Sequence, residues 1–100
     1  MAEMTLSDHE VDETVALFSA LAHPGRLRIL LALASAAPRA AGELGALAGL
    51  KQTAASHQLR LLKNARLITA QRAGRQVLYS LADAHVAHII RDAVAHMREP

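Results

Sequence analysis

Two histidines and two carboxylates near the C-terminus are side chains of the types that bind transition metals: Asp83, His85, His96 and Glu99. The chain contains no cysteine, so any metal that it holds must have nitrogen and oxygen ligands. Zinc takes about four such ligands in a tetrahedron, at roughly 2.0–2.2 Å. The residue types therefore predict a zinc site, with nickel or cobalt as the alternative if further ligands raise the coordination number.

The spacing of these residues predicts that two subunits share each site. A helix is expected over about residues 83–97, and His85 and His96 lie about three turns apart on one stripe of it. They are also about 16 Å apart along the helix axis, so one helix cannot close the site. Two antiparallel copies related by a two-fold axis would bring Asp83 and His85 of one subunit to His96 and Glu99 of the other. The expected assembly is a homodimer with two identical sites.

Other polar residues near this stripe have less specific interpretations. His88 and Asp92 share the stripe, where each could orient a ligand, replace one for another metal, or line the subunit interface. We expect His88 to be an accessory or interface residue more than a direct ligand. Asp83 is also well placed to cap the last helix. His9 could add a ligand from the N-terminal arm, but a single exposed histidine is more often without a role.

The charge distribution points to a second function. Net charge is only +2, but residues 1–25 contain five acids and no Lys or Arg. Residues 51–75 contain no acid and six cations: Lys51, Arg60, Lys63, Arg66, Arg72 and Arg75. A positive segment in a nearly balanced chain suits binding to a polyanion, and we expect nucleic acid.

The apolar spacing predicts four helices, a β-hairpin and a last helix. Ser7 and Glu10 form a capping-box pattern for the first helix, and Pro24 begins the second. A short third helix is expected over about residues 41–48, with Leu44 and Leu47 facing inward. A fourth begins near residue 52, strands follow over 67–70 and 76–81, and the helix over about 83–97 completes the chain.

The third and fourth helices form a helix-turn-helix pattern, in which the fourth would read DNA. Its polar side chains are Gln52, Thr53, Ser56, His57, Arg60 and Lys63. Gln and Arg suit bidentate contacts to adenine and guanine. The hairpin would act as a wing that contacts an adjacent groove or the backbone through Arg72, Arg75 and Gln76.

Three segments together resemble the ArsR/SmtB family of metal-responsive regulators: residues 21–30 (LAHPGRLRIL), 51–63 (KQTAASHQLRLLK) and 72–81 (RAGRQVLYSL). The resemblance implies a winged-helix homodimer, built largely on its first and last helices, that represses metal-resistance or efflux genes. The pattern of Asp83, His85, His96 and Glu99 is similar to the interfacial zinc site on this family's fifth helix. The resemblance also implies that the apo dimer binds an imperfect inverted repeat and that metal releases it.

The expected organisation is a single mostly α domain, a homodimeric winged helix-turn-helix with a β-hairpin. Its parts are the domain itself (1–100), the helix-turn-helix (about 41–65), the wing (about 67–81) and the dimerisation and metal-sensing helix (about 83–97). No secretory signal or membrane-spanning run is visible, so we expect a cytoplasmic protein with no membrane partner.

Other functions fit the sequence less well. A hydrolytic zinc enzyme is disfavoured because four protein ligands leave no open position and no further general base is present. We expect no small organic substrate. A constitutive or pH-responsive DNA-binding protein, with histidines that only pack the interface, remains the alternative from another class.

Overall fold

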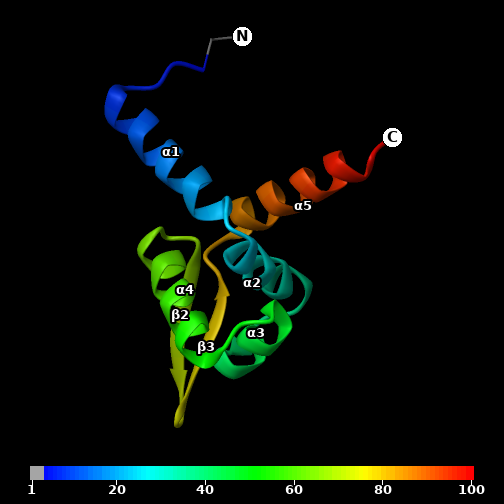
Figure 1. The fold of residues 1–100 in the computed structure, drawn as a ribbon. Coiled ribbons are helices and arrows are strands. Elements are labelled where there is room, and N and C mark those ends of the chain that lie inside the picture. The colour runs from blue at the N-terminus through cyan, green and yellow to red at the C-terminus, as the bar shows by residue number, and fades with distance from the viewer. Residues whose placement is uncertain (1–3) are drawn as a thin grey trace.

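The computed structural model describes residues 4–100, so Glu3, one of the five N-terminal acids, lies outside it. The elements follow the expected order, with one addition, the short strand β1. They are α1 (Asp8–Leu21), α2 (Pro24–Ser35), β1 (Arg39–Ala40), α3 (Ala41–Ala48), α4 (Gln52–Asn64), β2 (Ile68–Ala73), β3 (Gln76–Leu81) and α5 (Ala84–Arg98) (Figure 1). The expectation of a mostly α winged helix-turn-helix is confirmed.

Side-chain caps begin the first and last helices, as the sequence predicts. The Ser7 hydroxyl accepts from the Glu10 amide at 3.1 Å, and the Glu10 carboxylate accepts from the Ser7 amide at 2.9 Å. The hydrogen bond from the Ser7 backbone, with that from its side chain, lowers the pKa of Glu10 below its usual value. At α5, the Asp83 carboxylate accepts from the Val86 amide at 3.1 Å. Both caps satisfy helix amides that would otherwise lack partners.

The junction between α1 and α2 is a bend of 88°. The Nδ1 atom of His23 accepts from the amides of Gly25 and Arg26, at 3.1 and 3.3 Å, and Pro24 occupies the first turn of α2. Within residues 4–100, no single helix is long and apolar enough to cross a membrane; only α1 and α2 taken together meet that test.

The three strands form one antiparallel sheet in the order β1-β3-β2. β2 and β3 are joined by a two-residue turn, where Gly74 adopts a φ of 64°. The strand β1 pairs Arg39 with Tyr79 and Ala40 with Leu78. Two residues are too few to show the alternation that identifies a strand, so the sequence predicts only the hairpin.

The core lies where α2, α3 and α4 pack with the sheet and the first half of α5. Its fully buried side chains include Ile29, Leu30, Leu44 and Leu62. The expectation that Leu47 faces inward is wrong, because its side chain is 55% exposed. Leu44 faces the core with Gly45 and Ala48, and the short helix α3 turns Leu47 away from them.

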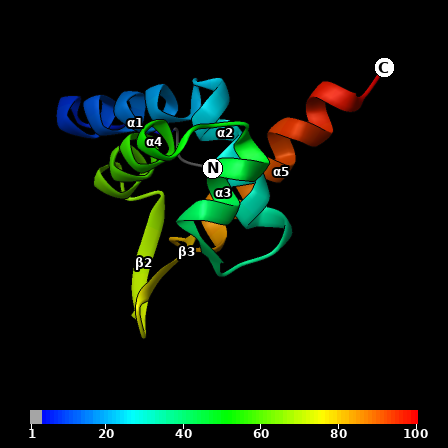
Figure 2. The ribbon, with the colours of Figure 1, turned by 60° about the horizontal axis from the view of Figure 1, so that its bottom comes forward.

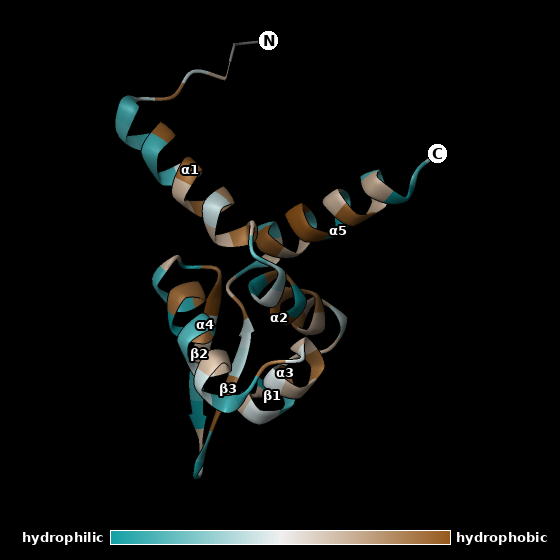
Figure 3. Ribbon diagram, viewed as in Figure 1, coloured by the Kyte–Doolittle hydropathy of each residue, from teal (hydrophilic) through white to brown (hydrophobic). Residues whose placement is uncertain are grey.

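The helices α1 and α5 extend from this core, away from the tip of the hairpin (Figures 1 and 2). No residue of α1 is buried, and Val11, Val15 and Phe18 on its apolar side are 44%, 57% and 58% exposed. In α5 only Val86 and Ile90 are buried. Both helices carry apolar residues (Figure 3), and some of these are exposed, among them Val15 in α1 and Met97 in α5.

The connection between α4 and β2 contains a backbone feature that the sequence does not reveal. Arg66 has a φ of 61°, in the left-handed region that favours glycine. Its guanidinium is ion-paired with Glu13 of α1 at 3.0 Å, but both side chains are largely exposed. An exposed pair contributes about 0–1 kcal/mol, whereas a left-handed non-glycine residue costs roughly 1–2 kcal/mol.

We therefore expect Arg66→Gly to raise the free energy of unfolding by up to about 1 kcal/mol, because relief of the backbone outweighs the lost ion pair. Arg66→Ala is the matched control: it also loses the pair but keeps the left-handed backbone, so it should be less stable than the wild type. Urea unfolding at one fixed protein concentration measures both variants. A glycine variant less stable than the alanine variant would contradict the explanation.

Candidate nucleic-acid interface and metal-ligand groups

The helices α3 and α4 are held in a close helix-turn-helix. Gly49 ends α3 with a φ of 69°, and the Leu50 amide donates to the Gly45 carbonyl at 2.8 Å. A Cβ atom on Gly45 would lie 3.1 Å from the Cβ of Ala55 in α4. The small residue at position 45 thus lets the two helices approach, and the turn directs α4 across α3.

The helix α4 has one buried and one exposed side. Ala55, Leu59 and Leu62 are buried in the core. All six of the predicted DNA-reading residues are exposed: Gln52, Thr53, Ser56, His57, Arg60 and Lys63. The core therefore fixes the helix by its apolar side and leaves its hydrogen-bonding groups available to a groove of DNA.

The wing places its polar residues at the end of the β2–β3 hairpin. Arg72, Arg75 and Gln76 are exposed, and the hairpin projects beyond the helices (Figure 2). In the part of the chain that the structure describes, neither arginine forms an ion pair. Their charges are therefore available to phosphates. The same holds for Arg60 and Lys63 of α4.

The four predicted metal ligands are exposed and lie at the two ends of α5. Asp83 Oδ1 and His85 Nδ1 are 3.6 Å apart, with side chains that are 56% and 90% exposed. His96 and Glu99 stand at the other end of the helix. Among residues 4–100 of one chain, no three His, Asp or Glu side chains come close enough together to hold a metal. The structure thus places Asp83 beside His85, but within one chain it does not bring His96 and Glu99 to them.

Three of the predicted ligands share one side of α5 with His88 and Asp92. At about 100° per residue, His85, His88, Asp92, His96 and Glu99 fall within roughly 80° of the helix circumference. All five are exposed, and the buried residues of α5 lie on another side.

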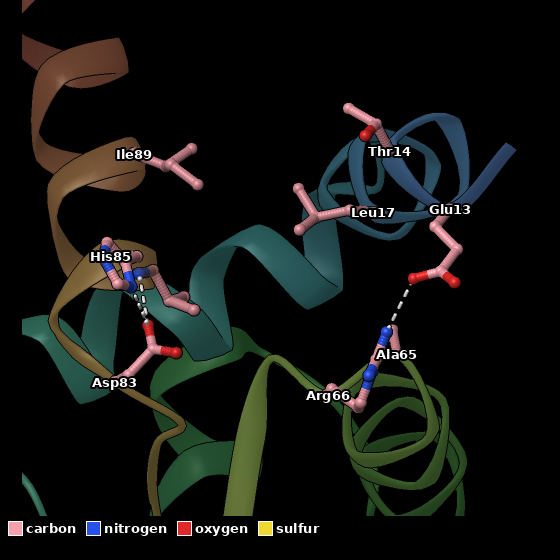
Figure 4. A pocket seen from close by; sticks show the side chains of 9 residues that line it. Glu13, Thr14, Leu17, Ala65, Arg66, Asp83, His85 and Ile89 are labelled. Atoms are coloured by element: carbon pink, nitrogen blue, oxygen red, sulfur yellow. Dashed lines mark hydrogen bonds and ion pairs between the residues drawn. The ribbon is translucent and has the colours of Figure 1, made fainter. Parts of the chain in front are cut away.

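The Asp83–His85 pair also lines a cavity of about 370 Å³ between α1, the end of α4 and α5. Glu13 and Arg66 lie across it, joined by their ion pair (Figure 4). His9 contacts the second oxygen of Glu13, with Nε2 and Oε1 2.5 Å apart, so its ring is placed on α1. No local sequence pattern indicates this grouping, because Glu13 and Arg66 are separated by 53 residues.

Comparison with known proteins agrees with this arrangement. A helix-turn-helix domain family matches residues 21–71. The chain is 40% identical over 94 residues to the transcriptional repressor SmtB homolog of Synechocystis, covering 94% of this chain and 70% of that protein. It is 40% identical over 91 residues to the transcriptional regulator NmtR of Mycobacterium tuberculosis, covering 91% and 75%.

Solved structures show the same fold. One is the homodimeric winged helix-turn-helix DNA-binding domain of a possible ArsR-family regulator from Mycobacterium bovis, with a TM-score of 0.82 and 30% identity over 95% of this chain and 90% of that one. Another is the antimony-specific transcriptional repressor AntR, with a TM-score of 0.83 and 31% identity over 97% and 87%. This chain belongs to the ArsR/SmtB family of winged helix-turn-helix transcriptional regulators, and it is a DNA-binding protein, not an enzyme.

Proposed function

We propose that this protein is a homodimeric repressor that binds operator DNA without metal and releases it when zinc binds two sites between its subunits. The observation that carries the proposal is the division of the ligands on α5. Asp83 and His85 stand 3.6 Å apart at one end, and His96 and Glu99 lie about 16 Å away on the same side. An antiparallel partner helix would bring Asp83 and His85 of one subunit to His96 and Glu99 of the other, and neither helix would have to change its conformation.

The dimer is supported by the surface that one chain leaves open. Val11, Val15 and Phe18 form an exposed apolar stripe on α1, and Met97 of α5 is 80% exposed. Contiguous exposed apolar residues of this kind mark interaction surfaces. The Mycobacterium bovis relative is described as a homodimer. We therefore assign α1 and the outer side of α5 to the subunit interface.

The donor set suits zinc. Two imidazoles and two carboxylates supply four nitrogen and oxygen ligands, which is the number that a closed tetrahedral site requires. Asp83 Oδ1 already accepts the Val86 amide, and its carboxylate retains acceptor sites for a metal. A bound zinc ion would add positive charge and link the two subunits. His88, exposed on the same side, leaves room for nickel or cobalt with more than four ligands.

The DNA-reading side chains lie on different elements from the metal ligands. They belong to α4 and the wing, whereas all four ligands belong to α5 and its cap. Zinc must therefore act by favouring a dimer arrangement that DNA does not. Linkage then requires DNA to weaken zinc binding by the same factor. The relatives that are named repressors support repression by this chain, and the resemblance to the family implies that metal relieves it.

For the wing, we expect Arg75→Ala to weaken binding to duplex DNA of any sequence and to reduce the slope of log affinity against log salt by about one, because one phosphate contact is lost. Arg98→Ala is the matched control: it removes an equal charge from the end of α5, so the slope should stay unchanged. Fluorescence anisotropy over a salt series measures both slopes. Equal slopes for wild type and Arg75→Ala would show that Arg75 of the wing contacts no phosphate.

For the metal site, we expect His96→Ala to bind operator DNA as the wild type does but to lose its response to zinc. Asp83→Ser separates the two roles of Asp83, because serine still caps α5 but cannot replace the carboxylate as a ligand. It should fold with wild-type stability and bind zinc at least tenfold more weakly. Zinc titration with and without a chelator, followed by DNA anisotropy, measures both properties. Wild-type DNA affinity unmoved by zinc, nickel or cobalt would refute metal sensing.

Shared sites can be tested by mixing two inactive variants. Asp83→Ser/His85→Ala and His96→Ala/Glu99→Gln each spoil both sites of their own homodimer. In the heterodimer one site keeps all four native ligands and the other keeps none, so we expect one zinc per heterodimer. Differently tagged subunits allow the heterodimer to be purified for metal analysis. If the heterodimer binds no zinc, the ligands do not meet across the interface.

A further inference from the structure

The apolar side of α1 is exposed, and the helix packs only weakly against its own subunit. None of its residues is buried, although Leu17, Ala20 and Leu21 near its end pack partly against the core. In a dimer built on α1, the place of each recognition helix depends on how α1 is joined to α4.

Arg26, in the first turn of α2, makes that connection. Its Nε donates to the Ala20 carbonyl at 2.7 Å, and one terminal nitrogen donates to the Ser19 carbonyl at 3.3 Å. These carbonyls belong to the last turn of α1, which contains no basic residue of its own. A cation at this end of a helix also interacts favourably with the helix dipole. Arg26 therefore caps α1 from the next helix.

The other terminal nitrogen of the same guanidinium donates to Gln58 Oε1 of α4 at 2.9 Å. Gln58 is half-buried, in contrast to its exposed neighbour His57. Its amide thus faces the body of the subunit and not the groove-facing side of α4. One rigid planar group, which lysine could not replace, joins the end of α1 to the middle of the recognition helix.

The second polar link between α1 and this half of the subunit is weaker. It joins Glu13 to Arg66, which lies beyond the end of α4, and the two side chains are 47% and 81% exposed. Exposed pairs are screened by water and salt and contribute little. The Arg26–Gln58 hydrogen bond is partly buried and reaches α4 itself, so it is the stronger constraint.

We propose that Arg26, acting through Gln58, is a positioning residue that fixes the recognition helix relative to the dimer interface and so sets the half-site spacing of the operator. This inference rests on the proposed dimeric DNA binding, but not on metal. Two recognition helices must sit about 34 Å apart to enter successive major grooves. A loosened α4 would still fold and still contact DNA, but it would tolerate wrong spacings.

The test uses the metal-free 100-residue chain and an inverted repeat selected from random duplex DNA by the wild type. Derivatives with one or two base pairs added or removed at the centre supply the wrong spacings. The variants are Arg26→Met, Gln58→Ala and their double mutant. Gln58→Glu retains an acceptor for Arg26, and Arg28→Met removes an exposed arginine two residues further along in α2.

We expect Arg26→Met and Gln58→Ala each to lower affinity for the selected spacing about tenfold and to reduce the penalty for wrong spacings. The double mutant should be no worse than Arg26→Met, because Gln58 has no bond to Arg26 left to lose once the guanidinium is gone. Gln58→Glu and Arg28→Met should keep the wild-type preference. If Arg26→Met does not fold, Gln58→Ala still tests the link, since Arg26 keeps both of its bonds to α1.

Two results would overturn the inference. One is a Gln58→Ala dimer with wild-type affinity and spacing preference, whether or not its unfolding free energy falls. The other is a double mutant whose loss equals the product of the two single losses. Failure of the proposed function looks different, because the wild type itself would then select no inverted repeat.

Discussion

The length of α5 is the constraint on which the rest of this molecule depends. Its 15 residues separate two pairs of ligands by about 16 Å, which is too far for one metal and suited to two half-sites. In the proposed dimer, an antiparallel partner completes each pair. The same proposed partner would cover the apolar side of α1, which contributes no buried residue to its own subunit. The ligand spacing and the open hydrophobic surface thus call for the same assembly.

The DNA-reading half satisfies different requirements and is complete within one chain. α4 is anchored by Ala55, Leu59 and Leu62, and Gly45 allows α3 to approach it closely. Charges are divided in the same way. Arg60, Lys63, Arg72 and Arg75 form no ion pairs within residues 4–100, whereas Arg26 and Arg39 bind carbonyls inside the fold. Arg26 and Arg39 stabilise connections between elements of the fold, and the cations of the recognition helix and wing remain available to phosphates.

Local patterns in the sequence were enough to predict the helices and the hairpin, but not the side-chain pairs that join one element to another. The Ser7–Glu10 capping box, the Asp83 cap and the glycine that ends α3 each act within a few residues, so their spacing predicts the helices that the structure has. The strand β1 is too short to have a period. Arg26–Gln58 and Glu13–Arg66 join residues 32 and 53 positions apart, and no local pattern encodes such pairs. The left-handed backbone at Arg66 was equally hidden, because a non-glycine residue gives no sign of it. Intersubunit ligation stays a prediction, and it rests on helix geometry, which excludes a site closed by one helix alone.

The weak attachment of α1 to its own subunit has a consequence for regulation. Only the end of α1 packs partly against its own core, so polar bridges hold it to the subunit and, in the proposed dimer, the partner helps to place it. One of those bridges, Glu13–Arg66, borders the same cavity as Asp83 and His85. The other, through Arg26, ends on the recognition helix. In the proposed dimer, the surface of α1 therefore meets the DNA-reading half at hydrogen bonds worth about a kcal/mol each, whereas α5 also reaches the core through Val86 and Ile90. Such links can shift the geometry of the dimer without unfolding the subunit, because the core contacts that stabilise it are elsewhere.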